Sequence, residues 1–274
     1  FEGGAGIAAA GGSRAGAVRH VLIGAVGGTF SGLAGLGGGT IMVPLMVRYL
    51  GMVQVNAHGT SLGVIIFTAI ASAAGYSFSY FPEWGIVLSM VVPALLLAPL
   101  GARTATRLES NRLRKVFASF LLVAAFLLLV LADPESIFAF SGTARFVVAA
   151  LIGVLAGFLS GLLGVGGGIL MVPASVFLLS MIQRDAQALA LVVMIPTAVS
   201  GVYAHTRLQN VDWTAAALLA AASIPFGFVA GWLASEYIPG ELLRVLFAIL
   251  LLYFSARMFE VKFGTLLRRG AAQD

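Results

Sequence analysis

The chain has 274 residues, of which 60% are hydrophobic and 10% are charged, with a net charge of +5 at pH 7. Soluble domains carry about 25% charged residues, so this composition and a mean hydropathy of +1.03 exclude an ordinary soluble fold. The absence of cysteine excludes disulfides and thiolate sites. Three scattered histidines do not indicate a metal site, and we expect no metal, no cofactor and no nucleic acid; basic loops facing anionic lipid account for the charge.

Residues 1–17 are rich in glycine and alanine and predict a flexible N-terminal tail. They contain no compact apolar segment followed by a cleavage site, so they are not interpreted as a signal peptide. Apolar segments then follow one another to residue 260, and a transmembrane helix needs about 20 mostly apolar residues. The chain therefore predicts an all-α membrane protein with several crossings, followed by a basic C-terminal tail over 261–274.

The apolar part of the chain is a tandem repeat. Segment 32–44 returns as segment 161–173, with most residues identical, and the same interval of 129 residues pairs Trp84 with Trp213. Such self-similarity indicates two copies of one structural unit. We therefore expect repeat one over 18–132, a linker over 133–145 and repeat two over 146–260, which together form one domain.

Each repeat begins with an apolar segment that is long for a single crossing, 18–50 or 146–180, and that a glycine cluster interrupts. Glycine runs are poor helix interiors and good positions for turns. The segment could cross the membrane once, or it could enter, turn at the glycines and leave on the same side. Three further spans are expected in each repeat, at 57–78, 84–103 and 114–132, and at 186–205, 212–234 and 242–258.

The positions of lysine and arginine favour one of these topologies, because cytoplasmic loops carry an excess of both. A single crossing divides the sixteen basic residues equally between the two faces. A hairpin with a cytoplasmic N-terminus places thirteen inside and only Arg145, Arg184 and Arg244 outside. The sequence therefore predicts a hairpin, an inner (plasma) membrane location, and cytoplasmic positions for both termini and the loop 103–115.

A hairpin followed by three crossings inverts the second repeat relative to the first. Inverted repeats with interrupted helices are a recurring plan of secondary transporters. Irregular backbone at membrane depth is tolerated only where protein buries it or where it lines a cavity. We therefore predict two inverted repeats, each a glycine-broken re-entrant hairpin plus three transmembrane helices, whose glycine turns face each other at a central site.

The glycine clusters are the first candidate site. A short helix is expected after each turn, and its free N–H groups and positive dipole end would point at the turn. Glycine allows a ligand to approach such backbone closely, so an anion can be held without a buried cationic side chain. Close packing of the hairpin arms is the alternative, and it is the preferred interpretation of the spaced glycines Gly24, Gly28 and Gly32. The predicted substrate contacts are Gly37, Gly38, Gly39, Thr40, Gly166, Gly167, Gly168 and Ile169.

Hydroxyl groups on the following spans are the second candidate. Thr60 and Ser61 are polar in repeat one only, and a substrate breaks the symmetry of a pseudo-symmetric cavity. We therefore expect them to contact the substrate, with a bond to their own helix backbone as the alternative. Thr68 and Thr197 match across the repeats near mid-span and are candidates to line the cavity.

The ionisable residues favour an anion over a cation as ligand. All eleven acidic residues lie in loops, at span ends or in tails, whereas cation-coupled carriers often place a carboxylate mid-span. His58 is the candidate for any proton-linked step, with an interfacial position as the alternative. His205 lies at a span end and predicts an interfacial position.

The motif Gly-Leu-Gly-Gly-Gly-x-x-x-Val-Pro at 35–44 is repeated at 164–173 with Val165 in the second position. This doubled motif resembles the TauE/SafE-type sulfite and organic-anion exporters, and the resemblance covers about residues 20–260. It implies a transporter, usually an exporter, of sulfite, a sulfonate or a related anion. Repeat two departs from the family's Thr-Ser-Leu pattern, so the implied role is carried only to Thr60 and Ser61.

Two other classes of function share some of these sequence features. A passive anion channel would share the composition and the backbone anion site, but glycine-broken inverted repeats fit alternating access better. A membrane-embedded hydrolase needs a nucleophile with a base or paired carboxylates, and the sequence has no Gly-x-Ser-x-Gly motif. We therefore expect a non-enzymatic transporter whose partners are a small anion and the lipid bilayer.

Overall fold

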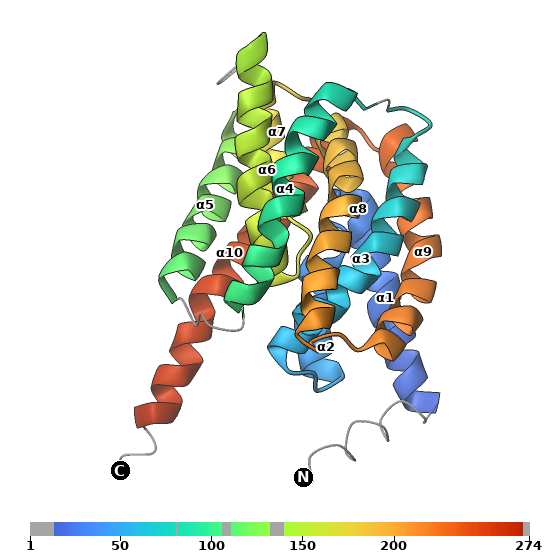
Figure 1. Ribbon diagram of the computed structural model, residues 1–274, viewed down its shortest axis with the longest axis vertical. Helices are drawn as coiled ribbons and strands as arrows, with labels where there is room; N and C mark the ends of the chain where they lie inside the picture. Colours follow the sequence, from blue (N-terminus) through green and yellow to red (C-terminus); the bar gives the residue numbers. More distant parts are fainter. Residues whose placement is uncertain (1–13, 81, 106–110, 132–139, 271–274) are drawn as a thin grey trace.

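A computed structural model describes residues 14–80, 82–105, 111–131 and 140–270, and every regular element in these ranges is an α-helix (Figure 1). The predicted linker and both predicted tails lie partly outside the described residues. The helices are α1 Arg14–Ala34, α2 Gly39–Tyr49, α3 Gln54–Tyr76, α4 Trp84–Ala105, α5 Asn111–Val130, α6 Thr143–Leu163, α7 Gly168–Leu179, α8 Gln183–Arg207, α9 Trp213–Glu236 and α10 Gly240–Gly270.

A helix–turn–helix hairpin opens each half of the chain. Helix α2 returns along α1, so that Gly38 lies against the backbone of Gly27, and α7 returns along α6, so that Gly167 lies against Ala156. The predicted interruption at both glycine clusters is therefore confirmed. The arms are unequal, since α1 has 21 residues and α2 has 11.

Backbone geometry explains the order of residues in the glycine motif. In the first turn Gly35, Gly37 and Gly38 have φ of 66°, 65° and 78°, and their counterparts in the second turn are also positive. This left-handed region favours glycine, because a Cβ is strained there. Leu36, the one turn residue with a side chain, is also the one turn residue without a positive φ. The sequence Gly-x-Gly-Gly thus matches the turn residue by residue.

Contacts between the two halves come in matched pairs. Helix α4 packs along α6, and the equivalent α9 packs along α1. Helices α3 and α8 pack against each other at the centre, with α9 beside α3 and α4 beside α8. Helices α5 and α10 pack together at one side (Figure 1). In the same view α2 lies toward the lower end, where α1 begins and α10 ends, and α7 toward the upper end.

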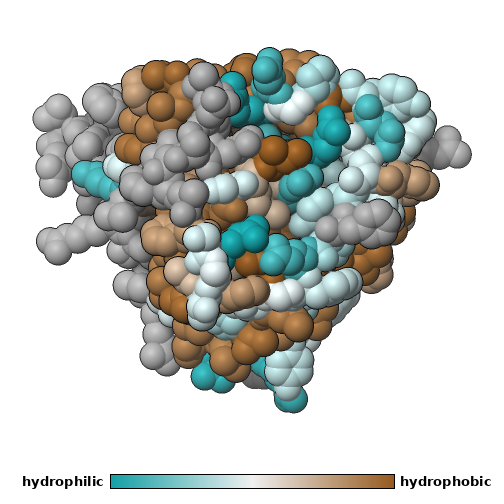
Figure 2. Space-filling model, turned by 90° about the horizontal axis from the view of Figure 1, so that it is seen from above, coloured by the Kyte–Doolittle hydropathy of each residue, from teal (hydrophilic) through white to brown (hydrophobic). Residues whose placement is uncertain are grey.

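Six helices, α1, α3, α4, α6, α8 and α9, are long and apolar enough to cross a membrane. The sequence also predicted spans in α5 and α10, which do not meet the same criterion over the described residues. In α5 the residues whose side chains the structure describes without interruption form an apolar helix, Phe117–Val130. Seen from the upper end, hydrophilic residues gather toward the centre and hydrophobic residues around the rim, as expected for a molecule surrounded by lipid (Figure 2).

Candidate functional site

The two glycine turns contact each other in the middle of the molecule. A methyl group added at Gly39 would lie 2.7 Å from the carbonyl oxygen of Gly164 in the other turn. The reciprocal distance, from a methyl group at Gly168 to the carbonyl oxygen of Gly35, is also 2.7 Å. The first residue of α2 and the first residue of α7 therefore each lie against the opposite turn, as the sequence predicted.

Both helix N-termini at this contact have free donors. The carbonyl of Gly38 accepts the N–H groups of Ile41 and Met42, and Gly167 accepts the matching pair in α7. In the described part of the chain, no backbone carbonyl accepts the N–H of the first two residues of either helix. Such free donors and the helix dipoles give α2 and α7 positive ends. The free donors are those of Gly39, Thr40, Gly168 and Ile169.

Thr40 adds a side-chain donor to this place. Its hydroxyl oxygen is buried and has no hydrogen-bond partner in the described structure. Burying a hydroxyl without a partner costs free energy, so most buried polar groups in proteins are paired. An unpaired hydroxyl beside free backbone N–H groups is therefore the feature of this region that a bound anion would explain.

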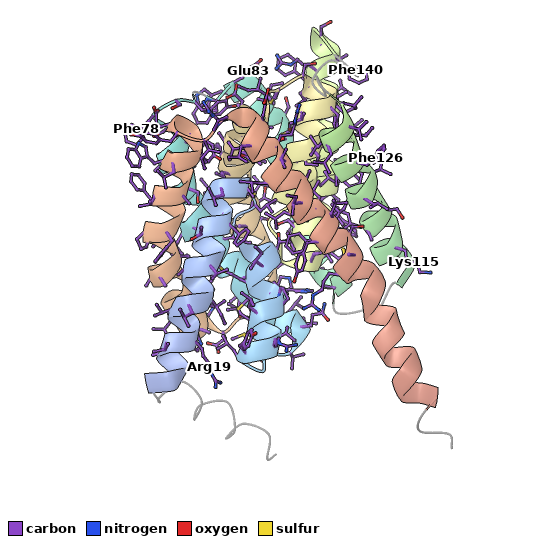
Figure 3. The ribbon with its side chains drawn as sticks, turned by 180° about the vertical axis from the view of Figure 1, so that it is seen from behind. Arg19, Phe78, Glu83, Lys115, Phe126 and Phe140 are labelled. Atoms are coloured by element: carbon purple, nitrogen blue, oxygen red, sulfur yellow. The ribbon has the colours of Figure 1, made fainter. Side chains whose placement is uncertain are left out.

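An ion pair lies at one end of the molecule. Glu83 forms an ion pair with Arg145, at 3.2 Å, outside the helical core, and Figure 3 places Glu83 at the upper end. Tyr80 lies in the same loop, where burial and the nearby carboxylates of Asp185 and Glu83 raise its pKa to about 12. The tyrosine is thus neutral at physiological pH. Among the described residues, no group of three His, Asp or Glu side chains gathers as a metal site.

The space around the candidate glycines is filled by protein. A methyl group at Gly38 would lie 2.4 Å from the carbonyl oxygen of Gly27, and one at Gly167 would lie 2.7 Å from that of Ala156. These backbone contacts give the triplets a packing role, which the sequence analysis held as the alternative. Ligand contact at their N–H groups remains a prediction.

Ile65 and Met194 fill the centre of the turn–turn contact. They are separated by 129 residues. Both side chains lie within 3.5 Å of the positions that an added methyl group would take at Gly37 and Gly166. Sequence reasoning missed this pair because it searched for polar and glycine residues. The repeat spacing was the signal that could have found it.

The two hydroxyl candidates of α3 separate in the structure. Ser61 donates to the carbonyl of Gly164 at 2.6 Å and also lies 2.8 Å from the carbonyl of His58. Thr60 instead accepts the N–H of Asp212, at 3.0 Å, from the segment that precedes α9. Only Ser61 therefore reaches a glycine turn through a hydrogen bond.

The two mid-span threonines bond to their own helices. Thr68 donates to the carbonyl of Val64 at 3.0 Å, and Thr197 to that of Val193 at 2.8 Å. Thr68 also lies 2.6 Å from the hydroxyl of Ser223 on α9. Both threonines are fully buried at packed helix interfaces, and their role in lining a cavity remains a prediction.

Equivalent polar side chains brace the C-terminal ends of α1 and α6. The hydroxyl of Tyr76 lies 3.0 Å from the carbonyl oxygen of Gly32 on α1 and 2.9 Å from the side-chain oxygen of Gln187. His205 replaces the tyrosine in repeat two, with Nε2 2.9 Å from the carbonyl oxygen of Gly161 on α6. The prediction that His205 is interfacial is therefore wrong. A residue near a helix end can be buried when a neighbouring carbonyl needs a donor.

His58 is also buried, against the second glycine turn. A methyl group at Gly164 would lie 2.4 Å from its Cα, and its Nδ1 has no hydrogen-bond partner in the described structure. The interfacial alternative therefore does not hold for this residue either. Its proton-linked role remains a prediction.

Known proteins with related sequences have names that describe them as probable membrane transporters. The chain is 28% identical over 77% of its length to "Probable membrane transporter protein YunE" of Bacillus subtilis, covering 84% of that protein. It is 30% identical over 56% of its length to a "Probable membrane transporter protein" of Haemophilus influenzae, covering 60% of that protein. A match to MJ0441 of Methanocaldococcus jannaschii, of the same description, is 26% identical and covers 37% of this chain and 40% of that protein.

The family comparison covers both halves of the chain. The family model described as "Sulfite exporter TauE/SafE" matches residues 5–128 and 149–272. The match includes both glycine turns and the six helices that are apolar enough to cross a membrane, except for the first six residues of α6. The chain therefore belongs to the TauE/SafE family of membrane transporters.

Proposed function

We propose that the chain is a secondary transporter that exports a small anion, of the sulfite or sulfonate class, by alternating access. The observation that carries this proposal is the meeting of the α2 and α7 N-termini, with free N–H groups and the unpaired hydroxyl of Thr40. The anion would accept hydrogen bonds from these groups, which suits a site without buried cationic side chains. The family description supports sulfite as the type of substrate.

Alternating access is supported by the symmetry of the contacts. The matched helix pairs, with α2 toward one end of the molecule and α7 toward the other, fit inverted repeats. In transporters of this plan one repeat moves against the other around a central site. Ile65 and Met194 fill the centre of the turn–turn contact, which favours a carrier with an occluded site over an open channel.

The proposed topology makes the end that carries both termini cytoplasmic. Figure 3 places Arg19 and Lys115 toward this end, in keeping with the positive-inside rule. We expect Val53→Cys in the α2–α3 loop to resist an impermeant thiol reagent added to intact spheroplasts, and Phe78→Cys in the α3–α4 loop to react. Both side chains are well exposed, and the chain has no other cysteine. The opposite labelling pattern would reverse the topology and remove the argument for export.

The anion site is tested by Thr40→Val, which removes the unpaired hydroxyl and keeps the shape of the side chain. We expect the affinity for sulfite to fall about tenfold or more, because a hydrogen bond to a charged group contributes about 1.5–3 kcal/mol. The protein should melt at the same temperature or slightly higher, because an unsatisfied buried group is lost. Calorimetry on the purified variant gives the affinity, and counterflow in proteoliposomes gives the transport rate.

Thr29→Val is the control. The hydroxyl of this part-buried threonine on α1 donates to the carbonyl of Ala25 in its own helix, at 2.9 Å, so we expect little change in sulfite affinity. Equal affinities of the wild type and Thr40→Val would exclude the α2 N-terminus as the site. Sulfite flux without counterflow in the wild type would identify a channel in place of a carrier.

A further inference from the structure

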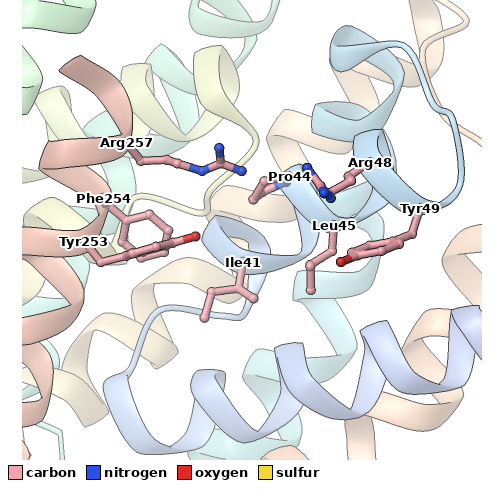
Figure 4. Close-up of a pocket in the computed structure, with 8 residues that line it drawn as sticks. All are labelled: Ile41, Pro44, Leu45, Arg48, Tyr49, Tyr253, Phe254 and Arg257. Carbon is pink, nitrogen blue, oxygen red and sulfur yellow. The ribbon is translucent and has the colours of Figure 1, made fainter. Parts of the chain in front are cut away.

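A cavity of about 270 Å³ lies between α2 and α10 (Figure 4), in the half of the molecule where α1 begins and α10 ends. Its apolar wall is formed by Ile41, Pro44 and Leu45 of α2 and by Phe254 of α10. The cavity adjoins the first turn of α2 through Ile41, whereas its charged residues are Arg48 in the last turn of α2 and Arg257 on α10. Its apolar lining indicates a ligand that brings hydrophobic surface of its own.

Four polar side chains complete the cavity. They are Arg48 and Tyr49 at the end of α2, and Tyr253 and Arg257 on α10. Figure 4 shows both guanidinium groups pointing into the gap between the helices, and both tyrosine hydroxyls directed inward as well. Two cations and two hydroxyl donors therefore converge on one place.

These arginines have no acidic partner in the described structure. The ion pair of the described residues, Arg145 with Glu83, lies elsewhere, and Arg48 instead stacks over the ring of Tyr49 at 5.8 Å. Two guanidinium groups that share a cavity repel each other unless an anion lies between them. Guanidinium groups bind phosphate well because their planar N–H groups match its oxygen atoms.

The repeat shows that this basic cavity belongs to one end of the molecule only. The residue equivalent to Arg48 in repeat two is Phe177, and that equivalent to Arg257 in repeat one is Leu127. Tyr49 is likewise replaced by Leu178. Pseudo-symmetry therefore does not account for the charges. The convergence of two arginines on one cavity would be explained by an anionic ligand found on one face of a membrane.

We propose that the cavity between α2 and α10 binds the phosphate group of an anionic phospholipid, with the acyl chains along the apolar wall. A free inorganic anion would use the arginines but leave the apolar wall unused, and the cavity exceeds what such an ion needs. Basic pockets between helices on the cytoplasmic side are suited to acidic lipid head groups, and tyrosine favours the membrane interface. The lipid site does not depend on which anion the protein transports.

The test is lipid binding to the full-length protein, measured by native mass spectrometry in detergent. Phosphatidylglycerol, phosphatidylcholine and inorganic phosphate are the probes. We expect the wild type to prefer phosphatidylglycerol over phosphatidylcholine. The double variant Arg48→Gln/Arg257→Gln should lose about 25-fold in affinity for phosphatidylglycerol, because each basic residue near an anionic surface contributes about fivefold. Binding of phosphatidylcholine should not change.

Arg207→Gln is the matched control. Arg207 is exposed and also stacks on a tyrosine, Tyr203 at 5.3 Å, but it lies outside the cavity, so this variant should keep the preference. If the double glutamine variant fails to fold, Arg48→Lys/Arg257→Lys retains the charges and should keep a clear preference for phosphatidylglycerol. Unchanged phosphatidylglycerol binding in the glutamine variant, or its loss from the folded lysine variant, would overturn the proposal. Displacement of the lipid by millimolar inorganic phosphate would assign the cavity to a free anion.

Discussion

Gly157→Ala is expected to be one of the most destabilising single substitutions in this protein. The added methyl group would lie 2.4 Å from the carbonyl oxygen of Ala94 and 2.5 Å from its Cα. Both atoms belong to the backbone of α4, so no side-chain rotation can relieve the clash, and α4 must separate from α6. We expect a loss of about 3 kcal/mol or more, at or above the upper end of the usual cost of overpacking. Thermal unfolding in detergent, followed by fluorescence, measures it.

The repeat supplies a second copy of the same test. Gly28 is the equivalent residue of α1, and a methyl group there would lie 2.3 Å from the carbonyl oxygen of Ser223 on α9. Gly28→Ala should therefore lower the melting temperature by a similar amount. Any protein that remains folded should keep its affinity for the anion, because Gly28 contacts α9, whereas its neighbour Gly27 contacts the turn before α2.

Gly63→Ala is the control for both variants. This glycine also lies inside a buried helix, but a methyl group there would meet its nearest neighbour at 3.6 Å, an ordinary contact distance. Alanine is the better helix former by about 1 kcal/mol, so the melting temperature should stay the same or rise. If the Gly157→Ala protein melts at the same temperature as the Gly63→Ala protein, the α4–α6 contact is looser than described.

The sequence predicted the helices and turns well, because their signals are local. Apolar segments gave the transmembrane helices, and the glycine motif gave the turns because its glycines are needed at positive φ. The ends of individual helices differ from the predicted spans by a few residues, as in α8, Gln183–Arg207, for which the predicted span is 186–205. Where α2 and α7 end along the chain depends on their packing against α3 and α8, which hydrophobicity does not describe.

The candidate site was predicted in part. The repeat and the hairpins were enough to predict that the two turns would meet. Ser61 and Thr60 were predicted to contact the substrate, which stays a prediction; Ser61 donates to a carbonyl of the other repeat, and Thr60 accepts the N–H of Asp212. Partners that come from the other half of the chain cannot be found from helix periodicity alone. For the same reason the buried donor role of His205 was missed.

Gly38→Ala should lose most of its stability, and any loss of anion binding should follow from that. Two separate costs act at this position. The residue has φ of 78°, where an alanine costs about 1–2 kcal/mol, and the methyl group would lie 2.4 Å from the carbonyl oxygen of Gly27. The clash is between backbone atoms of α1 and the turn. We therefore expect a total cost of about 3 kcal/mol or more, measured by thermal unfolding before any binding experiment.

Gly51→Ala separates these two costs. Gly51 has nearly the same backbone conformation, with φ of 67°, but nothing lies within 4 Å of the position that a methyl group would take. It should therefore show only the conformational cost of about 1–2 kcal/mol. The difference between the two variants is the energy of the α1–turn contact. The Gly38→Ala protein could instead melt at the same temperature as Gly51→Ala and yet fail to bind sulfite. That result would assign Gly38 to the ligand site. The added methyl group would then block approach to the free N–H groups of α2 while leaving the hairpin intact.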